Sequence, residues 1–429
     1  MNRMIEIIEY LTPLNRVFCS SDYDKAIEYL CTFLPFKVYE YPAENVHNGW
    51  VIPPKWDMKE AKIKKDGDVI LDGTQHPLSV ISLSKSFRGT VDVNELKKHM
   101  YYDTRFDDAI PYHFRQLYRS WERDWGFCVT KNLYESLDDG YYDVIIETEE
   151  SDGVLKVLEY TKKGKLDETI VIAAHLDHPG MSNDDAAGCA VGVELFKKLE
   201  QIDTKYSYQL FIHQEIIGPE YYLAHISDEQ RRKINEGIFI EMLGSNTKFG
   251  LQSAPQGITN IEYFLKKELE ESDIPFRHEP YGDVVVNGEY IYAGYGIPIS
   301  SFSRYPYPEY HTDKDNLSIM SEKRLVESLS ILLRAIERME KGPIVRKKYK
   351  GTICTSNPEY DLYIDPGQAA FGGFVDEPGV KNMRRFMELF PMYRNPVPVD
   401  LLADKFNIGY DNLYQYIKRF EEKRLVDLI

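Results

Sequence analysis

The stretch that decides the fold is TIVIAAHLDHPGMSNDDAAGCAVGVELFKKLE, residues 169–200. Its first part, 169–174, is a short apolar run rich in Ile and Val, which predicts a buried strand. Polar residues then interrupt the run. From 186 to 199 apolar side chains recur at four-residue spacing, which predicts a helix. In an open parallel sheet, the loop between such a strand and helix lies beyond the carboxyl end of the strand, where ligands bind.

This loop concentrates side chains of the metal-ligand type. Two imidazoles and three carboxylates lie within it: His175, Asp177, His178, Asp184 and Asp185. Without a counter-ion, carboxylates packed this closely would repel one another and lose hydration free energy. A divalent cation removes that cost, and imidazole nitrogen with carboxylate oxygen is a donor set that suits zinc. The simpler alternative is a solvated acidic loop that binds no ion.

Composition excludes several classes of partner. The chain has 429 residues, of which 43 % are hydrophobic, so we expect a real core divided over more than one unit. A formal net charge of −17 disfavours a nucleic acid or an anionic membrane as partner. We expect neither a signal peptide nor a membrane span, because the N-terminal apolar run contains charges and no run approaches ~20 residues. Five scattered cysteines without a CxxC pair indicate reduced thiols and a cytoplasmic protein.

Hydrophobic periodicity divides the chain into five segments. Residues 1–45 predict helices that pack on a sheet, and 46–135 predict an inserted domain of short strands with Gly, Asp and Pro turns. From 136 to 345 strands alternate with helices, which is typical of a layered α/β domain. We interpret 346–385 as a linker and 386–429 as a winged-helix or helix-turn-helix module. The predicted fold is therefore a mostly parallel mixed sheet flanked by helices, with an inserted β-rich domain and a C-terminal module.

The C-terminal module is close to neutral. From Pro396 onward it contains five basic and six acidic residues. A DNA-reading module carries a basic surface, so a structural or partner-binding role is the better interpretation.

Ligand-type side chains also follow other predicted strands of the layered domain. The strand candidates are 144–147, 169–174, 208–213, 237–240 and 297–302. His175 follows the second of these, Glu215 the third and Glu241 the fourth, while His311 lies in a loop beyond the last. Because parallel strands end at one edge of a sheet, we expect these side chains to meet in one cleft.

In this order the motifs resemble a known family. They are HLD at 175–177, NDDAAG at 183–188, a Glu three residues before Gly218, EMLG at 241–244 and YHTDKDN at 310–316. The set is similar to that of zinc aminopeptidases of the M28 type. Within that type the chain most resembles the bacterial proteins described as "aminopeptidase-like domain" proteins of unknown function. The resemblance is dense from about residue 169 to 317 and looser elsewhere, and only the ordered set is specific.

The resemblance implies roles for the residues of the first loop. His175 resembles the histidine ligand of the first metal, with Asp177 as the residue that orients it. Asp184 resembles the carboxylate that bridges two metals. The resemblance also implies a cis peptide between Asp184 and Asp185, which costs about 3–4 kcal/mol in a non-proline bond.

The later motifs are assigned in the same way. Glu215 resembles the general base, and Glu241 stands where the family usually has an aspartate ligand. His311 resembles the histidine of the second metal. One position departs from the family: its Glu-Glu pair ends in a metal ligand, but here Ile216 follows Glu215 and cannot coordinate. His178 adds a further candidate ligand.

We therefore expect one zinc ion, with two as the alternative. A subset of six residues would hold it: His175, His178, Asp184, Asp185, Glu241 and His311. The implied function is a zinc-dependent aminopeptidase that hydrolyses N-terminal peptide or aminoacyl amide bonds. Glu215 would accept a proton from a metal-activated water. Tyr310 or Arg304 would then stabilise the oxyanion. The sequence leaves open whether the chain forms a homo-oligomer.

Three other functions fit the same sequence. Loss of a metal ligand at Ile216 favours a degenerate hydrolase that binds a peptide or a modified sugar without cleaving it. A single-zinc acyltransferase of the glutaminyl-cyclase kind would use the same sheet. A regulator that acts through its C-terminal module is the third alternative.

Overall fold

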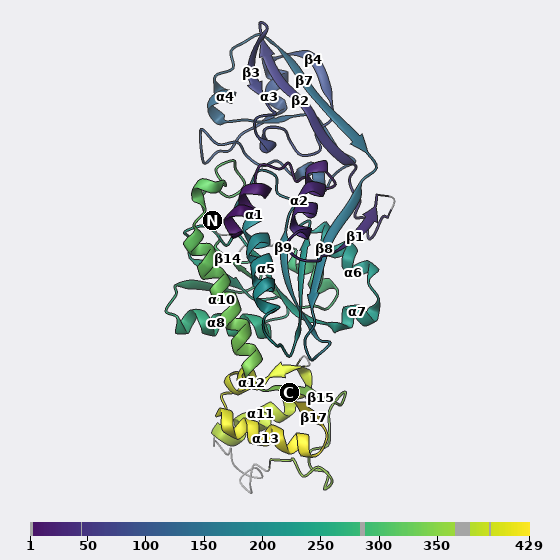
Figure 1. The fold of residues 1–429 in the computed structure, drawn as a ribbon, viewed down its shortest axis with the longest axis vertical. Coiled ribbons are helices and arrows are strands. Elements are labelled where there is room, and N and C mark those ends of the chain that lie inside the picture. Colours follow the sequence, from purple (N-terminus) through teal and green to yellow (C-terminus); the bar gives the residue numbers. More distant parts are fainter. Residues whose placement is uncertain (1–2, 44, 284–287, 365–377, 394–395) are drawn as a thin grey trace, which may run out of the picture.

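The computed structural model describes the chain except residues 1–2, 44, 284–287, 365–377 and 394–395. Three parts follow one another along the long axis of the molecule (Figure 1). A small β-rich part lies at one end, a large layered part in the middle and the C-terminal module at the other end. Among the described residues, no helix combines the length and the apolar character needed to cross a membrane.

The layered part is built on a mixed sheet that has eight strands within the described residues, in the order β1-β8-β10-β9-β11-β14-β12-β13. β10, β9, β11 and β14 run parallel. β8 is antiparallel to both of its neighbours, β1 and β10, whereas β12 is antiparallel to β14 and parallel to β13. The strands are β1 (Lys37–Pro42), β8 (Val154–Lys162), β9 (Thr169–His175), β10 (Ser207–His213), β11 (Ile234–Glu241), β12 (Phe249–Gln252), β13 (Phe276–Glu279) and β14 (Ile299–Ser303). The predicted mostly parallel mixed sheet is confirmed.

Helices cover both faces of this sheet. One face is covered by α1 (Arg3–Leu11), α2 (Ser21–Cys31), α5 (Ala186–Leu199), α8 (Asn260–Glu271) and α10 (Glu322–Lys341). Toward the other face lie α6 (Ile217–His225) and α9 (Glu289–Gly294), while the short α7 (Asp228–Lys233) leads into β11. β9 shows why both faces are needed: Ile172 belongs to the first apolar cluster and Val171 to the second. A strand buried on both faces has the continuous apolar sequence seen in 169–174.

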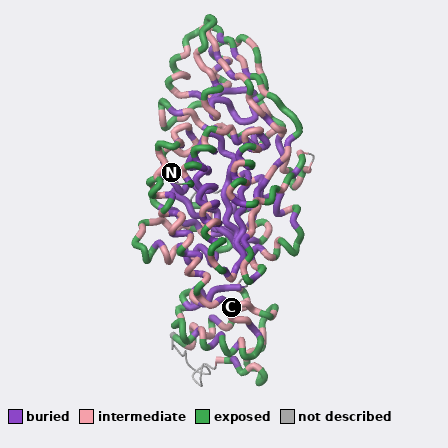
Figure 2. The backbone as a smooth tube through the Cα atoms, viewed as in Figure 1, coloured by how far each residue is buried: buried purple, intermediate pink, exposed green. Residues whose placement is uncertain are grey.

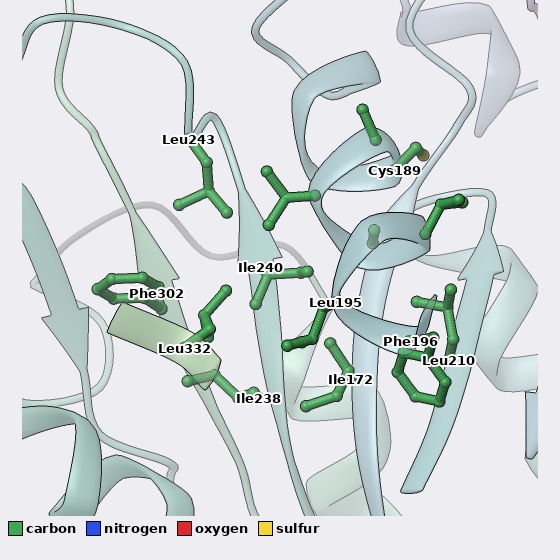
Figure 3. Packing of buried hydrophobic residues seen from close by; sticks show 14 of the residues in the cluster. Ile172, Cys189, Leu195, Phe196, Leu210, Ile238, Ile240, Leu243, Phe302 and Leu332 are labelled. Atoms are coloured by element: carbon green, nitrogen blue, oxygen red, sulfur yellow. The ribbon is translucent and has the colours of Figure 1, made fainter. Parts of the chain in front are cut away.

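Apolar packing fixes α5 over the parallel strands. Leu195 and Phe196 of α5 lie against Ile172 of β9 and Leu210 of β10 (Figure 3). All four side chains are fully buried, and burial of each contributes about 1.5–3 kcal/mol. The buried residues concentrate in this middle part (Figure 2). The loop between β9 and α5 therefore starts and ends on rigid elements.

The inserted part has its own sheet, in the order β3-β2-β7-β4. Its elements are β2 (Lys55–Lys65), β3 (Asp68–Asp72), β4 (Phe87–Asp92), α3 (Val93–Lys98), β5 (Met100–Tyr101), β6 (Phe127–Cys128), α4 (Lys131–Glu135) and β7 (Tyr141–Ser151), with short 3-10 turns at Pro77–Ser79 and Arg115–Leu117. We expected residues 144–147 in the layered sheet, and this was wrong because β7 pairs with β2 and β4. Burial alternates along the start of β7, as in an antiparallel strand with one solvated face.

The C-terminal module has a separate apolar core. A small sheet in the order β16-β15-β17 packs with three helices in the described residues. The elements are β15 (Ile344–Lys347), α11 (Pro378–Leu389), β16 (Val397–Pro398), α12 (Val399–Phe406), α13 (Tyr410–Glu422) and β17 (Val426–Leu428), with a 3-10 turn at Phe390–Met392. A further 3-10 turn, Leu317–Ile319, precedes α10 in the layered part. Of the predicted linker 346–385, residues 365–377 lie outside the described residues. The winged-helix assignment stays a prediction.

Candidate metal centre

Four neighbouring strands carry candidate ligands to one edge of the large sheet. β9 ends at His175 and β11 ends at Glu241. Glu215 lies two residues beyond β10, and His311 lies in the loop after β14. These strands are adjacent and parallel, so their carboxyl ends meet at this edge.

Asp184 lies at the middle of the cluster. Its Oδ1 is 3.0 Å from His175 Nε2, and its Oδ2 is 3.0 Å from His178 Nδ1. The same Oδ2 is 3.1 Å from Nε2 of His311. Ligand atoms of His175, His178 and Asp184 all lie within 4.8 Å of one another, and all three residues are buried. The structure thus brings three imidazoles onto one carboxylate.

These short separations are not hydrogen bonds. Within the described part of the chain, His178 Nδ1, His311 Nε2 and Asp184 Oδ2 are buried without a hydrogen-bond partner of acceptable geometry. Leaving polar atoms buried and unsatisfied costs several kcal/mol unless another group binds them. Two ligands of a tetrahedral zinc ion lie about 3.3 Å apart, given metal–ligand bonds near 2.0–2.2 Å. The donor types and their spacing therefore fit zinc.

Asp177 connects the cluster to the predicted base. Its Oδ1 lies 3.3 Å from His175 Nδ1 and accepts the backbone N–H of Glu215 at 2.9 Å. Carboxylates commonly orient metal-binding histidines through the second ring nitrogen. Glu215 Oε2 lies 3.3 Å from His178 Nε2, and the Glu215 side chain is 14 % exposed, whereas that of Asp184 is 2 % exposed. Glu215 is thus on the more open side of the cluster.

The electrostatics of the cluster also call for a cation. Glu241 is completely buried, with Oε2 3.9 Å from His175 Nε2, and burial raises its pKa well above its ordinary value. Burial alone would lower the pKa of His175, but Asp177 and Asp184 outweigh it and raise that pKa well above its usual range. Protons thus compensate the buried charge when no metal is bound, and a divalent cation would replace them.

Asp185 has a structural task that the sequence did not predict. Its carboxylate accepts the N–H groups of Gly188 at 2.7 Å and Met242 at 3.0 Å, and so caps the start of α5. A Cβ on residue 188 would collide with this carboxylate, so a glycine is required there. Through these backbone contacts Asp185 fixes the start of α5 against the end of β11. That Asp185 also binds a metal stays a prediction. The peptide between Asp184 and Asp185 is cis, as the resemblance implied.

The two candidates for oxyanion stabilisation differ. The Tyr310 ring stacks on the His311 ring with 3.8 Å between centroids, beside the cluster. Arg304 is 2 % exposed, and its guanidinium is occupied by Glu327, by the carbonyl of Thr247 and by stacking on Phe249. The prediction for Arg304 was wrong: these contacts bury its guanidinium in the core, where it ties the end of β14 to α10.

Asp315 is a supporting residue that the sequence did not single out. Its carboxylate accepts the N–H groups of Ser182 at 3.2 Å, Asn183 at 2.6 Å and Asp184 at 3.1 Å. It also accepts the Tyr307 hydroxyl at 2.6 Å. Asp315 thereby joins the loop of Asp184 to the loop of His311. It lies within the quoted motif YHTDKDN, which was the available signal.

Two further supports come from distant parts of the chain. The buried Arg16 donates from Nη2 to the carbonyls of His178 at 2.7 Å and Met181 at 2.8 Å. Tyr112 of the inserted part donates its backbone N–H to the His311 carbonyl at 2.9 Å. Its ring lies edge-on to His178 and His311, with centroids 5.0 and 5.4 Å away. No local sequence signal marks either residue.

Comparisons with known proteins agree with this architecture. The model of the family "Domain of unknown function (DUF4910)" matches residues 5–342. A Clostridium acetobutylicum protein, provisionally named a polysaccharide biosynthesis protein with an aminopeptidase-like domain, is 27 % identical over 344 residues, covering 78 % of this chain and 77 % of its own.

Two solved structures share the fold. A crystal structure of a C. acetobutylicum protein, provisionally named a peptidase, has a TM-score of 0.76 and 23 % identity, covering 99 % of this chain and 96 % of its own. The zinc aminopeptidase BSAP from Bacillus subtilis has a TM-score of 0.59 and 13 % identity, covering 78 % and 95 %. At these identities the likeness shows the fold alone.

Proposed function

The chain belongs to the DUF4910 family, and from this premise we propose that it is a zinc-dependent aminopeptidase. It would hydrolyse N-terminal peptide bonds or aminoacyl amides. The zinc-aminopeptidase fold of a structural neighbour supports the reaction class. The aminopeptidase-like domain in the name of the C. acetobutylicum relative supports it as well.

One observation carries the proposal. Asp184 has histidine nitrogens at 3.0–3.1 Å from both of its oxygens, in a buried cluster with the more open carboxylate of Glu215 beside it. Buried donors without hydrogen bonds next to a solvent-facing base are what a hydrolytic metal centre requires. The residues that would hold zinc are His175, Asp184 and Glu241, together with His178 and His311.

Each residue of the chain has a role in this scheme. Zinc, when bound, supplies Lewis acidity and lowers the pKa of a coordinated water from about 15.7 to about 7. We assign Glu215 as the general base that takes a proton from the attacking water and passes it to the leaving amine. Its backbone is held by Asp177, and its carboxylate lies 3.3 Å from His178 Nε2. The hydroxyl of Tyr310 would stabilise charge on the carbonyl oxygen.

Glu215→Gln tests the assignment. The amide has the same shape but cannot accept the proton, so the turnover of aminoacyl p-nitroanilides should fall by about 10²–10⁴-fold with zinc content unchanged. Glu229→Gln is the matched control, because Glu229 is exposed on α7. A Glu215→Gln protein that turns over as fast as the control would refute the base assignment.

A second candidate is a protein that binds a peptide or a modified sugar without cleaving it. Ile216, which cannot coordinate a metal, favours this candidate. The mention of polysaccharide biosynthesis in the name of the relative makes a sugar ligand reasonable. Zinc content with no turnover on any aminoacyl amide would select this second function.

A further inference from the structure

We propose that Arg105 of the inserted part is a positioning residue of the candidate metal centre, because it holds the loop 304–321, which carries Tyr310 and His311. The inference rests on the proposed function for the roles of those two residues. It goes beyond that function by giving a task to the inserted part, which contributes none of the candidate ligands. Arg105 would act through the backbone of the loop and not on the substrate itself.

The loop 304–321 has little regular structure of its own. Between the end of β14 and the start of α10, the described structure contains one short 3-10 turn, at Leu317–Ile319. His311 also has a φ of 58°, in the left-handed region that residues other than glycine rarely adopt. Such a conformation costs free energy and persists only where surrounding contacts impose it. A candidate ligand on this loop therefore depends on contacts from elsewhere in the chain.

The inserted part holds the peptide groups on both sides of His311. Arg105 Nη2 donates to the Tyr310 carbonyl at 2.7 Å, and that carbonyl belongs to the peptide group that precedes His311. The N–H of Tyr112 donates to the His311 carbonyl at 2.9 Å, in the peptide group that follows. The φ and ψ angles of a residue are the rotations of these two planar groups about its Cα. The two contacts together therefore fix the left-handed conformation of His311.

Asp103 orients the Arg105 guanidinium for this task. Each Asp103 oxygen accepts Arg105 Nε at 3.1 Å, and Oδ2 also accepts Nη2 at 2.8 Å. Nη1 then donates to the Pro308 carbonyl at 3.1 Å, so that one planar group spans two carbonyls of the loop. A lysine ammonium lacks this fixed fork, so Arg105→Lys should keep the charge but hold the loop less well.

A nearby ion pair joins the same two segments and offers a matched control. Lys314 Nζ lies 2.9 Å from Asp108 Oδ2, and the Asp108 side chain is 70 % exposed. This pair lies on side chains and does not involve the carbonyls of Tyr310 and His311. Asp108→Asn therefore removes one attachment between the inserted part and the loop, but it leaves the support at His311 unchanged.

Hydrogen exchange of the zinc-free full chain measures the support directly. In Arg105→Ala, peptides that cover 309–312 should exchange about 10-fold faster than in wild type, because a charged hydrogen bond is lost. Arg105→Lys should give an intermediate rate, and Asp108→Asn should give the wild-type rate. Peptides from β9 should exchange at the wild-type rate in all three variants, and a cooperative thermal transition would show that each variant is folded.

Turnover and a metal spectrum give two further measurements. The kcat of Arg105→Ala on aminoacyl p-nitroanilides should fall about 10–100-fold, as is typical when the support of a metal-binding residue is lost. Its KM should stay near that of wild type, because the loop would act on the transition state. With cobalt in place of zinc, the visible absorption should change in Arg105→Ala and not in Asp108→Asn, because these bands depend on ligand geometry.

Other results overturn the inference. Wild-type exchange over 309–312 in Arg105→Ala would refute it even if turnover fell, because Arg105 would then act on the substrate. Equal changes in Asp108→Asn would refute it as well, since any attachment of the inserted part would then have the same effect. Hydrolysis by wild type and by Arg105→Ala at the same rate refutes this inference and leaves the proposed function standing. Faster exchange and an altered cobalt spectrum in Arg105→Ala, without hydrolysis by any chain, do the reverse.

Discussion

Replacing Asp315 by Asn tests whether Asp315 holds the loops of the candidate metal centre in place, because it changes none of the candidate ligands. One carboxylate oxygen accepts the N–H of Asp184 and the Tyr307 hydroxyl, while the other accepts Ser182 and Asn183. An amide keeps one acceptor and places an NH₂ group where the other was. The Tyr307 hydroxyl can rotate to accept, but the N–H of Asp184 cannot. One buried donor is then left unsatisfied, which costs about 1–3 kcal/mol.

Two measurements read out this change. Urea unfolding of the zinc-free protein should show the loss of about 1–3 kcal/mol. Competition with a chromophoric chelator should show about 10–100-fold weaker zinc binding, because Asp184 loses the contact that positions it. Asp273→Asn is the control, since Asp273 is exposed and its left-handed backbone suits Asn. Wild-type stability and zinc affinity in Asp315→Asn would refute the idea that Asp315 holds the two ligand loops in register.

Zinc binding should stabilise the fold, because the unfolded chain does not assemble the cluster. At a free zinc concentration of about 100 times the dissociation constant, the free energy of unfolding should rise by about 2.7 kcal/mol. An unchanged melting temperature after chelation would contradict this prediction. Asp404→Asn should weaken the attachment of the C-terminal module. The Asp404 carboxylate accepts the Tyr263 hydroxyl at 2.5 Å and pairs with Lys267 at 2.7 Å. Burial alone would raise the pKa of Asp404, but Lys267 and Tyr263 outweigh it and lower that pKa below 3.8. The contribution of Asp404 to the free energy of unfolding is therefore fully present above pH 3.8 and is lost as the pH falls through the lower pKa of the folded state. The melting temperatures of wild type and variant should differ at pH 7 and converge in strong acid; a constant difference would exclude the ion pair.

The sequence alone indicated the part of the candidate metal centre that lies in the loop between β9 and α5. His175 follows a run of apolar residues, and Asp184 precedes a helix, so strand, loop and helix were visible from hydrophobic spacing alone. Glu215, Glu241 and His311 could be added because parallel strands end at one edge of a sheet. Those rules place residues at an edge, but they do not say which side-chain atoms face one another.

The contacts of two candidate residues were therefore not predicted. Asp185 stands beside Asp184 and has the same chemistry, yet it caps α5. Arg304 lies beside the motif of His311, yet Glu327 and Thr247 occupy it inside the core. Both outcomes depend on rotamers and neighbours that only packing selects.

The sequence by itself determined which ligand-type residues follow the strands and that the fold is layered, because strands and helices are encoded in the spacing of apolar residues. Only the tertiary structure decided which residues hold the cluster in place. Arg16, Tyr112 and Asp315 reach the cluster from segments far apart in the chain, and β7 joined the small sheet through pairings that its own residues do not specify. Such contacts arise because a buried donor or carbonyl must find a partner wherever the folded chain brings one, and that requirement leaves no periodic trace in the sequence.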